Sequence, residues 1–402
     1  MKNTIGKMAV TLCPSFGIRR WGVNLPYHPP LQSAVSAQYT VAGSSSFTWN
    51  DVVGLTPKHD SSDLRGFFPQ VALCNRNSEN MCEFMPFVIE EQVVGYVHHG
   101  FADHLRTFKD VFIFPEGSSY DSNFRFHLTL HPLLSTPEDR TKAVADVVKC
   151  FANKLIPGIR NELYPVTSSF GTPEFFSLER AAAPYFGIKA YGIHLNGYVE
   201  GEKQDYLWVG KRSNTKSKYP GQLDHLVAGG LEFTRLCRNI LSPRSILDLF
   251  VQNSLVISKS FLPLLIEITY ACAQPHGISC TENVVKECKE EAGIPRSISS
   301  KAKAVGAVTY SDIDGYRFNR DVLFCYDLKL PEDFLPTNED GEVESFRLLP
   351  VELVANIIKS TQYYKANCNL VIIDFLFRHG YIKPEAPGYL KLLQSLRSGE
   401  CT

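Results

Sequence analysis

The sequence predicts a mixed α/β protein in which an α+β region precedes a second domain, and three observations support this prediction. The chain has 402 residues, which suits two domains when one domain spans roughly 100–200 residues. Hydrophobic residues make up 44% of the chain and charged residues 21%, a composition typical of soluble globular proteins with substantial cores. Short apolar runs with the spacing of strands also alternate with helical patterns.

Charge and cysteine usage exclude several classes of protein. The formal net charge is −1, so the chain lacks the basic footprint that is typical of nucleic-acid binding. The eleven cysteines occur singly, with no Cys-x-x-Cys pair and no Cys/His cluster at zinc spacing. We interpret them as free thiols in a reducing compartment. Neither a zinc site nor a secreted disulfide framework is expected.

The first 45 residues differ in composition from the rest. No acidic residue occurs before Asp51, whereas the segment carries Lys2, Lys7, Arg19 and Arg20 and is rich in serine. Basic, serine-rich and acid-poor composition is typical of organellar transit peptides. We therefore predict a disordered transit peptide over residues 1–45, and the alternative is a disordered extension without a targeting role.

Residues 46–185 are predicted to form a small α+β domain. Four segments have the alternation of strands: 83–89, 92–97, 108–114 and 125–130. A helix is expected to begin at Pro137, because apolar residues recur at helical spacing as far as Phe151 and acidic residues occupy the first turn. This region shows no nucleophile, metal cluster or phosphate loop.

A second domain is predicted over residues 186–384, followed by a tail at 385–402 that looks like a surface appendage. Its expected strands are 193–199, 206–210, 304–310 and 322–330. Its expected helices are 281–292 and 351–360, and an apolar stretch follows at 370–377.

The helix expected at 281–292 carries the residues that suggest chemistry. Glu287, Glu290 and Glu291 fall at positions i, i+3 and i+4 and are therefore expected to share one face. Carboxylates this close raise one another's pKa unless a cation neutralises them, and hard oxygen ligands suit Mg²⁺ or Mn²⁺. The alternative is an ordinary solvated face, in which Lys286 and Lys289 pair with the acids.

The segment from Lys286 to Ile294 resembles the closing half of the Nudix box, G-x5-E-x7-R-E-U-x-E-E-x-G-U, with lysine where the family has arginine. The match is closest to plant chloroplast-type Nudix proteins with an N-terminal thiamin-pyrophosphokinase-related (DUF4743-like) domain, and it covers residues 47–384. Three further strings carry it: Phe176–Gly187, Leu207–Ser213 and Asp224–Leu231. Ile278 occupies the first glutamate position of the box, and Lys for Arg is not a neutral change.

The box glycine falls on Gly229 only if a segment of about 43 residues, 232–274, is skipped. Its stretch from 254 to 273 is largely apolar, but Lys259, Pro263 and Glu267 argue against a membrane span. We interpret the segment as a translated retained intron, because it ends at Gln274 and a CAG codon there would fit a splice acceptor. The competing interpretation is a genuine surface insertion, which would be long for an unstructured connection.

The resemblance implies an α/β/α sandwich with a mixed sheet, and a box that binds Mg²⁺ or Mn²⁺ for diphosphate hydrolysis. Glu287 and Glu291 would bind the metal, and Glu290 would complete the site. A further ligand or base from outside the helix is expected at Glu344 or Glu342. Four residues are candidate substrate contacts: Lys211, Arg212, Gly229 and Gly230. His194 and His225 are expected to be structural or substrate-lining, without a catalytic role.

The resemblance also implies a substrate class and a location. The expected reaction is Mg²⁺-dependent hydrolysis of thiamin-diphosphate derivatives, especially oxidised or damaged forms, in the chloroplast stroma. The alternatives are hydrolysis of nucleoside diphosphate derivatives such as ADP-ribose or NADH, a catalytically impaired binding protein if the 232–274 segment is genuine, and a cytoplasmic location. The expected partner is a small-molecule diphosphate, with no nucleic acid or membrane.

Overall fold

The computed structural model describes residues 47–56, 62–115, 126–152, 154–216, 218–231 and 278–399. All of these belong to one structural unit, which extends from Ser46 to Thr402. The predicted transit peptide at 1–45 and the predicted insertion at 232–274 lie outside the described residues.

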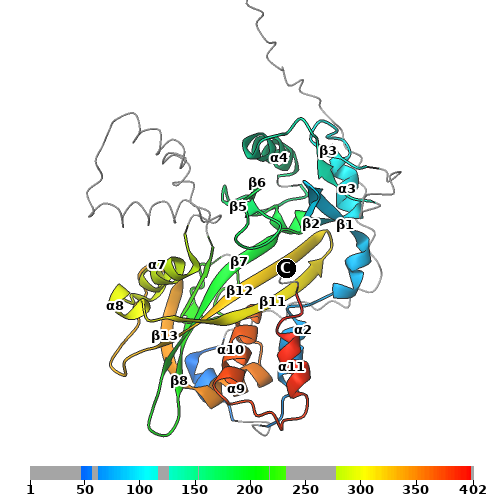
Figure 1. The fold of residues 1–402 in the computed structure, drawn as a ribbon. Coiled ribbons are helices and arrows are strands. Elements are labelled where there is room, and N and C mark those ends of the chain that lie inside the picture. Colours follow the sequence, from blue (N-terminus) through cyan, green and yellow to red (C-terminus); the bar gives the residue numbers. More distant parts are fainter. Residues whose placement is uncertain are drawn as a thin grey trace, which may run out of the picture. The chain divides into compact units, whose positions relative to one another are not determined.

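A seven-stranded mixed sheet forms the centre of this unit (Figure 1). Its path runs β11 (Lys303–Asp314), β12 (Arg317–Lys329), β7 (Lys189–Val199), β8 (Tyr206–Arg212) and β13 (Val343–Pro350). Two short strands complete it, β10 (Val227–Gly230) beside β7 and β9 (Leu223–Asp224) beside β8. β12 and β7 run parallel, whereas the other pairs are antiparallel. The mixed sheet predicted for the second domain is confirmed.

Helices cover both faces of the sheet. Because side chains alternate along a strand, Trp208 of β8 packs in the core shared with α7 (Cys280–Ala292), whereas its neighbours Leu207 and Val209 pack toward α9 (Val351–Ser360) and α10 (Ala366–Arg378). The short helix α8 (Arg296–Ser299) follows α7. The result is the α/β/α sandwich that was expected.

The first region has a core of its own, built from short strands and two helices. Its elements are β1 (Phe84–Ile89), β2 (Gln92–His98), α3 (His99–Leu105), β3 (Phe112–Ile113), β4 (Thr129–Leu130), α4 (Pro137–Phe151), β5 (Leu163–Val166), β6 (Phe176–Glu179) and the 3₁₀ turns η1 (Ser78–Glu83) and η2 (Ala183–Phe186). The strands predicted at 83–89 and 92–97 and the helix from Pro137 are confirmed. The strand predicted at 108–114 is reduced to the two residues of β3, because backbone turns at Phe108 and Val111 precede them. The segment predicted at 125–130 pairs through β4 and through a bridge from Leu128 to Phe87.

Both ends of the described chain pack on the C-terminal helices. The helices α1 (Trp49–Val53) and α2 (Phe67–Ala72) contribute Val52, Phe67 and Val71 to the core around α9 and α10. These helices therefore pack with the second domain, although the boundary at residue 185 assigned them to the first. The prediction of a surface appendage after Pro384 is also wrong. Leu392 in α11 (Tyr389–Ser395) and Leu396, directly after this helix, are both fully buried. Among the described helices, none combines the length and the apolarity needed to cross a membrane.

Candidate metal and diphosphate site

The acidic helix α7 is fixed at both ends by local sequence. The backbone N–H of Glu282 donates to the Ser279 side chain at 3.2 Å, which caps the N-terminus. Gly293 ends the helix in the left-handed conformation, at φ 63°. Between these caps, Cys288 and Ala292 are fully buried against the sheet. The apolar side of the helix therefore packs against the sheet, and this packing orients the acidic residues.

Of the three candidate glutamates on α7, Glu287 and Glu291 face strand β10. The backbone N–H of Ala228 donates to Glu291 Oε2 at 2.8 Å. Glu287 is only 9% exposed and lies against Gly229, where a Cβ atom would come within 2.5 Å of the glutamate Cδ. Asn283 Nδ2 donates to the Gly230 carbonyl at 3.1 Å and ties the same strand to the helix. Gly229 is therefore needed so that the Glu287 carboxylate can approach the strand backbone.

Glu290 lies apart from the other two. Its side chain is 51% exposed and pairs with Lys286 at 3.6 Å. Successive helical residues are separated by about 100°, so burying Glu291 against β10 turns Glu290 toward solvent. The expectation that all three carboxylates share one face therefore holds only for Glu287 and Glu291.

The surroundings of Glu291 favour a bound cation. Burial raises the pKa of its carboxyl group well above the usual value, against the lowering effect of the Ala228 hydrogen bond. Asp224, Glu287 and Glu342 raise the pKa further through their negative charges. A divalent cation would offset both the burial cost and this repulsion. The donor set fits such an ion, because its oxygen ligands are hard and closely spaced.

The carboxylate from outside the helix comes from the segment before β13. One ligand oxygen from each of Glu291, Asp340 and Glu342 lies within 4.8 Å of the others. Glu344 was the first choice from sequence, but it lies apart, pairing with Lys211 and Asn214 at 3.3 Å each. The β13–β8 ladder slips in register between Val343 and Ser345, and such a bulge redirects the extra residue. Geometry therefore favours Glu342, the second sequence candidate.

A pocket of about 430 Å³ opens over these carboxylates. Its lining includes five acidic side chains and six basic ones. The acidic residues are Glu162, Glu287, Glu291, Asp321 and Glu342, and the basic residues are Arg160, Arg180, Arg212, Lys216, Lys218 and Lys365. Mixed charges of this kind suit an anionic ligand that is bound partly through a metal ion and partly through cationic side chains.

The first region supplies part of this pocket. Arg160, Tyr164 and Arg180 line it, and Arg180 pairs with Glu162 at 2.6 Å while it lies over the Tyr164 ring at 5.3 Å. Only Arg180 fell within a segment that carried the family resemblance. Arg160 and Tyr164 could not be predicted as pocket residues from the sequence, because only the fold brings them next to the acidic helix α7.

Of the four residues predicted to contact the substrate, three line the pocket and one does not. Arg212 lines the pocket and pairs with Asp224 at 2.6 Å, and Gly229 and Gly230 also line it. Lys211 pairs with Glu344 instead and is not among the lining residues.

The two histidines are buried, and His194 lines the pocket. Burial, reinforced by the charge of His225, lowers the pKa of His194 well below its usual value. Burial also lowers the pKa of His225 to about 4, against the raising effect of Asp224. Burial therefore favours the neutral form of both imidazoles.

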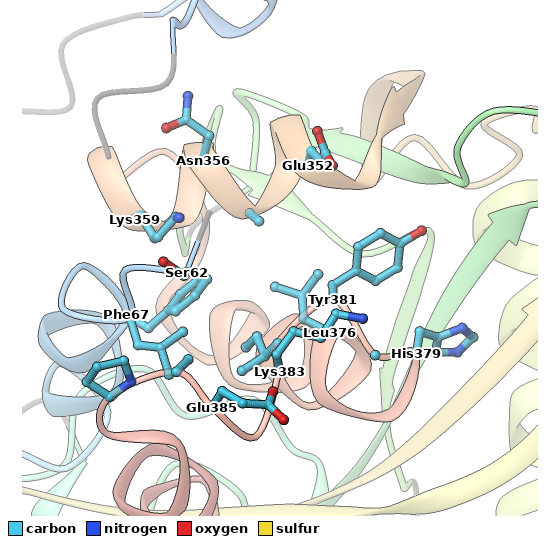
Figure 2. A pocket seen from close by; sticks show the side chains of 16 residues that line it. Ser62, Phe67, Glu352, Asn356, Lys359, Leu376, His379, Tyr381, Lys383 and Glu385 are labelled. Atoms are coloured by element: carbon cyan, nitrogen blue, oxygen red, sulfur yellow. The ribbon is translucent and has the colours of Figure 1, made fainter. Parts of the chain in front are cut away.

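A larger hollow of about 710 Å³ lies against α2, α9 and the segment after α10 (Figure 2). Phe67, Lys359, Tyr381 and Lys383 surround it. None of the α7 residues line it. Volume alone would select this hollow, but Glu287 and Glu291, of which Glu291 has the raised pKa, are on the other side of the sheet.

Carboxylates that need a cation, next to a rim of basic side chains, are what metal-assisted hydrolysis of phosphate anhydrides requires. Comparisons with known proteins agree with this class. "Nudix hydrolase 20, chloroplastic" from Arabidopsis thaliana is 54% identical over 389 residues, covering 96% of this chain and 92% of that protein. "Nudix hydrolase 24, chloroplastic" from the same plant is 53% identical over 380 residues, covering 93% and 90%.

The chain therefore belongs to the Nudix hydrolases, enzymes that hydrolyse a diphosphate bond in small substrates and generally use divalent metal ions. A model described as a domain of unknown function (DUF4743) matches residues 66–190, consistent with the family resemblance. Among solved structures, the NUDIX domain of Shewanella oneidensis NrtR, complexed with ADP ribose, is 10% identical with a TM-score of 0.29, covering 48% of this chain and 90% of that one.

Proposed function

We propose that the protein uses Mg²⁺, or Mn²⁺ in its place, to hydrolyse the diphosphate bond of thiamin-diphosphate derivatives, with oxidised or damaged forms as the preferred substrates. The observation that carries the metal proposal is the packing of Glu287 and Glu291 against the Ala228–Gly230 backbone at the base of a pocket with a basic rim. The thiamin assignment is supported only by the resemblance.

The proposed metal ligands are Glu287, Glu291 and Glu342, with Asp340 close enough to Glu291 and Glu342 to join them. Glu290 is exposed and pairs with Lys286, so it would influence the metal only through its negative charge and not as a ligand. A divalent cation held here neutralises charge on the diphosphate oxygens and lowers the pKa of a bound water.

The chain's own residues would orient the substrate. Arg180 and Lys218 line the pocket from two different segments of the chain and can hold phosphate oxygens by charge-assisted hydrogen bonds. Lys365 is held beside Asp224 at 3.6 Å, and Arg212 at 2.6 Å, so their charges are fixed near the carboxylates before a substrate binds. Fixed charges cost no reorganisation when negative charge develops on the leaving phosphate.

Residues 46–185 are proposed to act as a pocket-forming domain rather than as a second enzyme. Tyr164 and Arg160 come from this region and meet Tyr191 of β7 in the lining. Aromatic faces beside a basic rim suit the ring of an organic diphosphate. Because the relatives are named chloroplastic, we also propose a plastid location, with residues 1–45 as the transit peptide.

A substrate screen tests the proposal. Phosphate-containing products are measured with Mg²⁺, with Mn²⁺ and with EDTA, using thiamin diphosphate, its oxidised derivatives, ADP-ribose and NADH. Glu291→Gln serves as the metal-site variant, because glutamine keeps an acceptor for the Ala228 N–H but loses the charge. A protein lacking residues 232–274 is assayed beside the full chain.

We expect Mg²⁺-dependent turnover that is highest for the oxidised thiamin derivatives and is lost in Glu291→Gln. Preference for ADP-ribose or NADH would contradict the substrate assignment but keep the chemistry. Full activity in EDTA would contradict the metal role. Turnover in the shortened protein but not in the full chain would indicate that the full chain is a catalytically impaired binding protein.

A further inference from the structure

Three potential metal ligands to which the proposed hydrolytic site assigns no role meet beside β10, and one of them, His194, also lines the pocket. His194 lies on β7, His225 lies between β9 and β10, and Cys368 lies in the first turn of α10. One ligand atom from each lies within 4.8 Å of the others. The two imidazole rings are 4.8 Å apart between centroids and nearly perpendicular, at 86°. No spacing in the sequence suggested this group, since the members are 31 and 143 residues apart.

The group is enclosed, and one ring nitrogen of each histidine lacks a hydrogen-bond partner among the described residues. His194 and His225 are each 4% exposed and Cys368 is fully buried. Nδ1 of His194 and Nε2 of His225 have no hydrogen-bond partner among the described residues. Buried ring nitrogens normally have a partner, so two such atoms on adjacent rings call for an explanation. A bound metal ion would explain both unpartnered nitrogens and the thiol beside them.

Asp224 holds the thiol and one histidine in place. The Cys368 thiol donates to Asp224 Oδ1 at 2.9 Å, and the backbone N–H of His225 donates to the same oxygen at 2.9 Å. The other oxygen of Asp224 accepts from Arg212 at 2.6 Å. Partners that fix a ligand in this way commonly surround protein metal sites.

We propose that His194, His225 and Cys368 bind a borderline-soft divalent cation, Zn²⁺ foremost, at a site separate from the carboxylate site on α7. Two imidazoles and a thiolate are zinc donors, whereas Mg²⁺ prefers oxygen. At Zn–N distances of about 2.0–2.1 Å and Zn–S of about 2.3 Å, tetrahedral ligand atoms are roughly 3.4–3.7 Å apart. The present spacing of at most 4.8 Å therefore requires a contraction on the order of 1 Å.

The charged groups around the site act in both directions. Metal binding would replace the Cys368 proton, which leaves to solvent and no longer bonds to Asp224, so Zn²⁺ and the thiolate together would carry one positive charge. The Asp224 carboxylate favours a cation here, whereas Arg212 and Lys365, 2.6 Å and 3.6 Å from Asp224, oppose it. The bound ion would join β7, the β9–β10 connection and α10. Since Ala228 follows His225 by three residues, the ion would stiffen the strand that holds Glu291.

Metal content and cobalt spectroscopy on the full chain test the proposal independently of hydrolysis. Purified protein is analysed for zinc, stripped with a chelator and titrated with Co²⁺ in the presence of excess Mg²⁺, which occupies the carboxylate site. Cys368→Ser removes the thiolate but keeps a donor for Asp224. Cys325→Ser is the matched control, because Cys325 is also fully buried but lies in the core against α10 rather than beside the histidines.

We expect about one zinc per chain, a thiolate-to-cobalt charge-transfer band in wild type and Cys325→Ser, and at least about a hundredfold weaker binding in Cys368→Ser, since even the partners of metal ligands contribute 10–100-fold. Absence of the band in wild type, or its persistence in Cys368→Ser, would overturn the proposal. If Cys368→Ser does not fold, X-ray absorption at the zinc edge of wild type decides instead. One sulfur and two nitrogen neighbours support the site, and an all-oxygen shell contradicts it.

Discussion

The contact between Gly229 and Glu287 makes a sharp prediction about geometry in the hydrolytic site. A Cβ atom at position 229 would lie 2.5 Å from Glu287 Cδ and 2.7 Å from its Oε1, whereas ordinary contact begins at 3.4 Å. The carboxylate would therefore have to move by about 0.9 Å, and a misplacement of about 1 Å can cost 10²-fold in rate. Gly229→Ala is accordingly expected to lower kcat/KM about a hundredfold, or about 2.7 kcal/mol in the barrier.

The adjacent glycine provides the control. A Cβ at Gly230 would meet only Tyr164 Oη at 3.7 Å and an Arg180 nitrogen at 3.9 Å, which is ordinary contact. Gly230→Ala should therefore keep activity within a few-fold. Neither glycine has a positive φ, so both variants should fold, with melting temperatures close to wild type in circular dichroism. Equal activity losses in the two variants, or an unchanged Gly229→Ala, would refute the reasoning.

Three further predictions concern the substrate, the pH dependence and the C-terminus. Arg180→Met should raise KM about tenfold with kcat little changed, because it removes a charge-assisted contact made before the chemical step. Lys203→Met, at an exposed position, is the control and should leave KM unchanged. A fall in kcat alone in Arg180→Met would contradict the binding role. Burial raises the pKa of Asp321 to about 6 from 3.8, so its protonation stabilises the fold at low pH and this contribution is lost as the pH rises through 6. Urea unfolding between pH 4 and 7 should therefore show a decline that Asp321→Asn flattens, and an unaltered slope would disprove the shift. Leu392→Ala, at a fully buried position, should lower the free energy of unfolding by about 2–5 kcal/mol, whereas Leu390→Ala, 71% exposed, should change it by less than about 0.5 kcal/mol.

Local patterns in the sequence predicted the acidic helix α7 well. The caps at Ser279 and Gly293 and the buried side of α7 depend on neighbouring residues only, so they could be derived from spacing. The same is true of the long strands of the sheet. Local spacing could not distinguish Glu290 from Glu291, because only the position of β10 decides which carboxylate becomes buried.

Contacts between distant segments could not be predicted in this way. A bulge in β13 exchanges Glu344 for Glu342 at the pocket, and bulges leave little trace in composition. Arg160 reaches the site only because the first region packs against β12. Burial of the tail likewise depends on α9 and α10 offering an apolar surface to Leu392.

The central claim is that the buried carboxylates of α7 hold a divalent cation. Manganese binding, followed by electron paramagnetic resonance of the free ion, measures this directly without a substrate. Wild type and Glu290→Gln should both remove free Mn²⁺ from solution and release it to excess Mg²⁺, whereas Glu291→Gln should bind it at least about tenfold more weakly while remaining folded. Equal binding by wild type and Glu291→Gln would contradict the account.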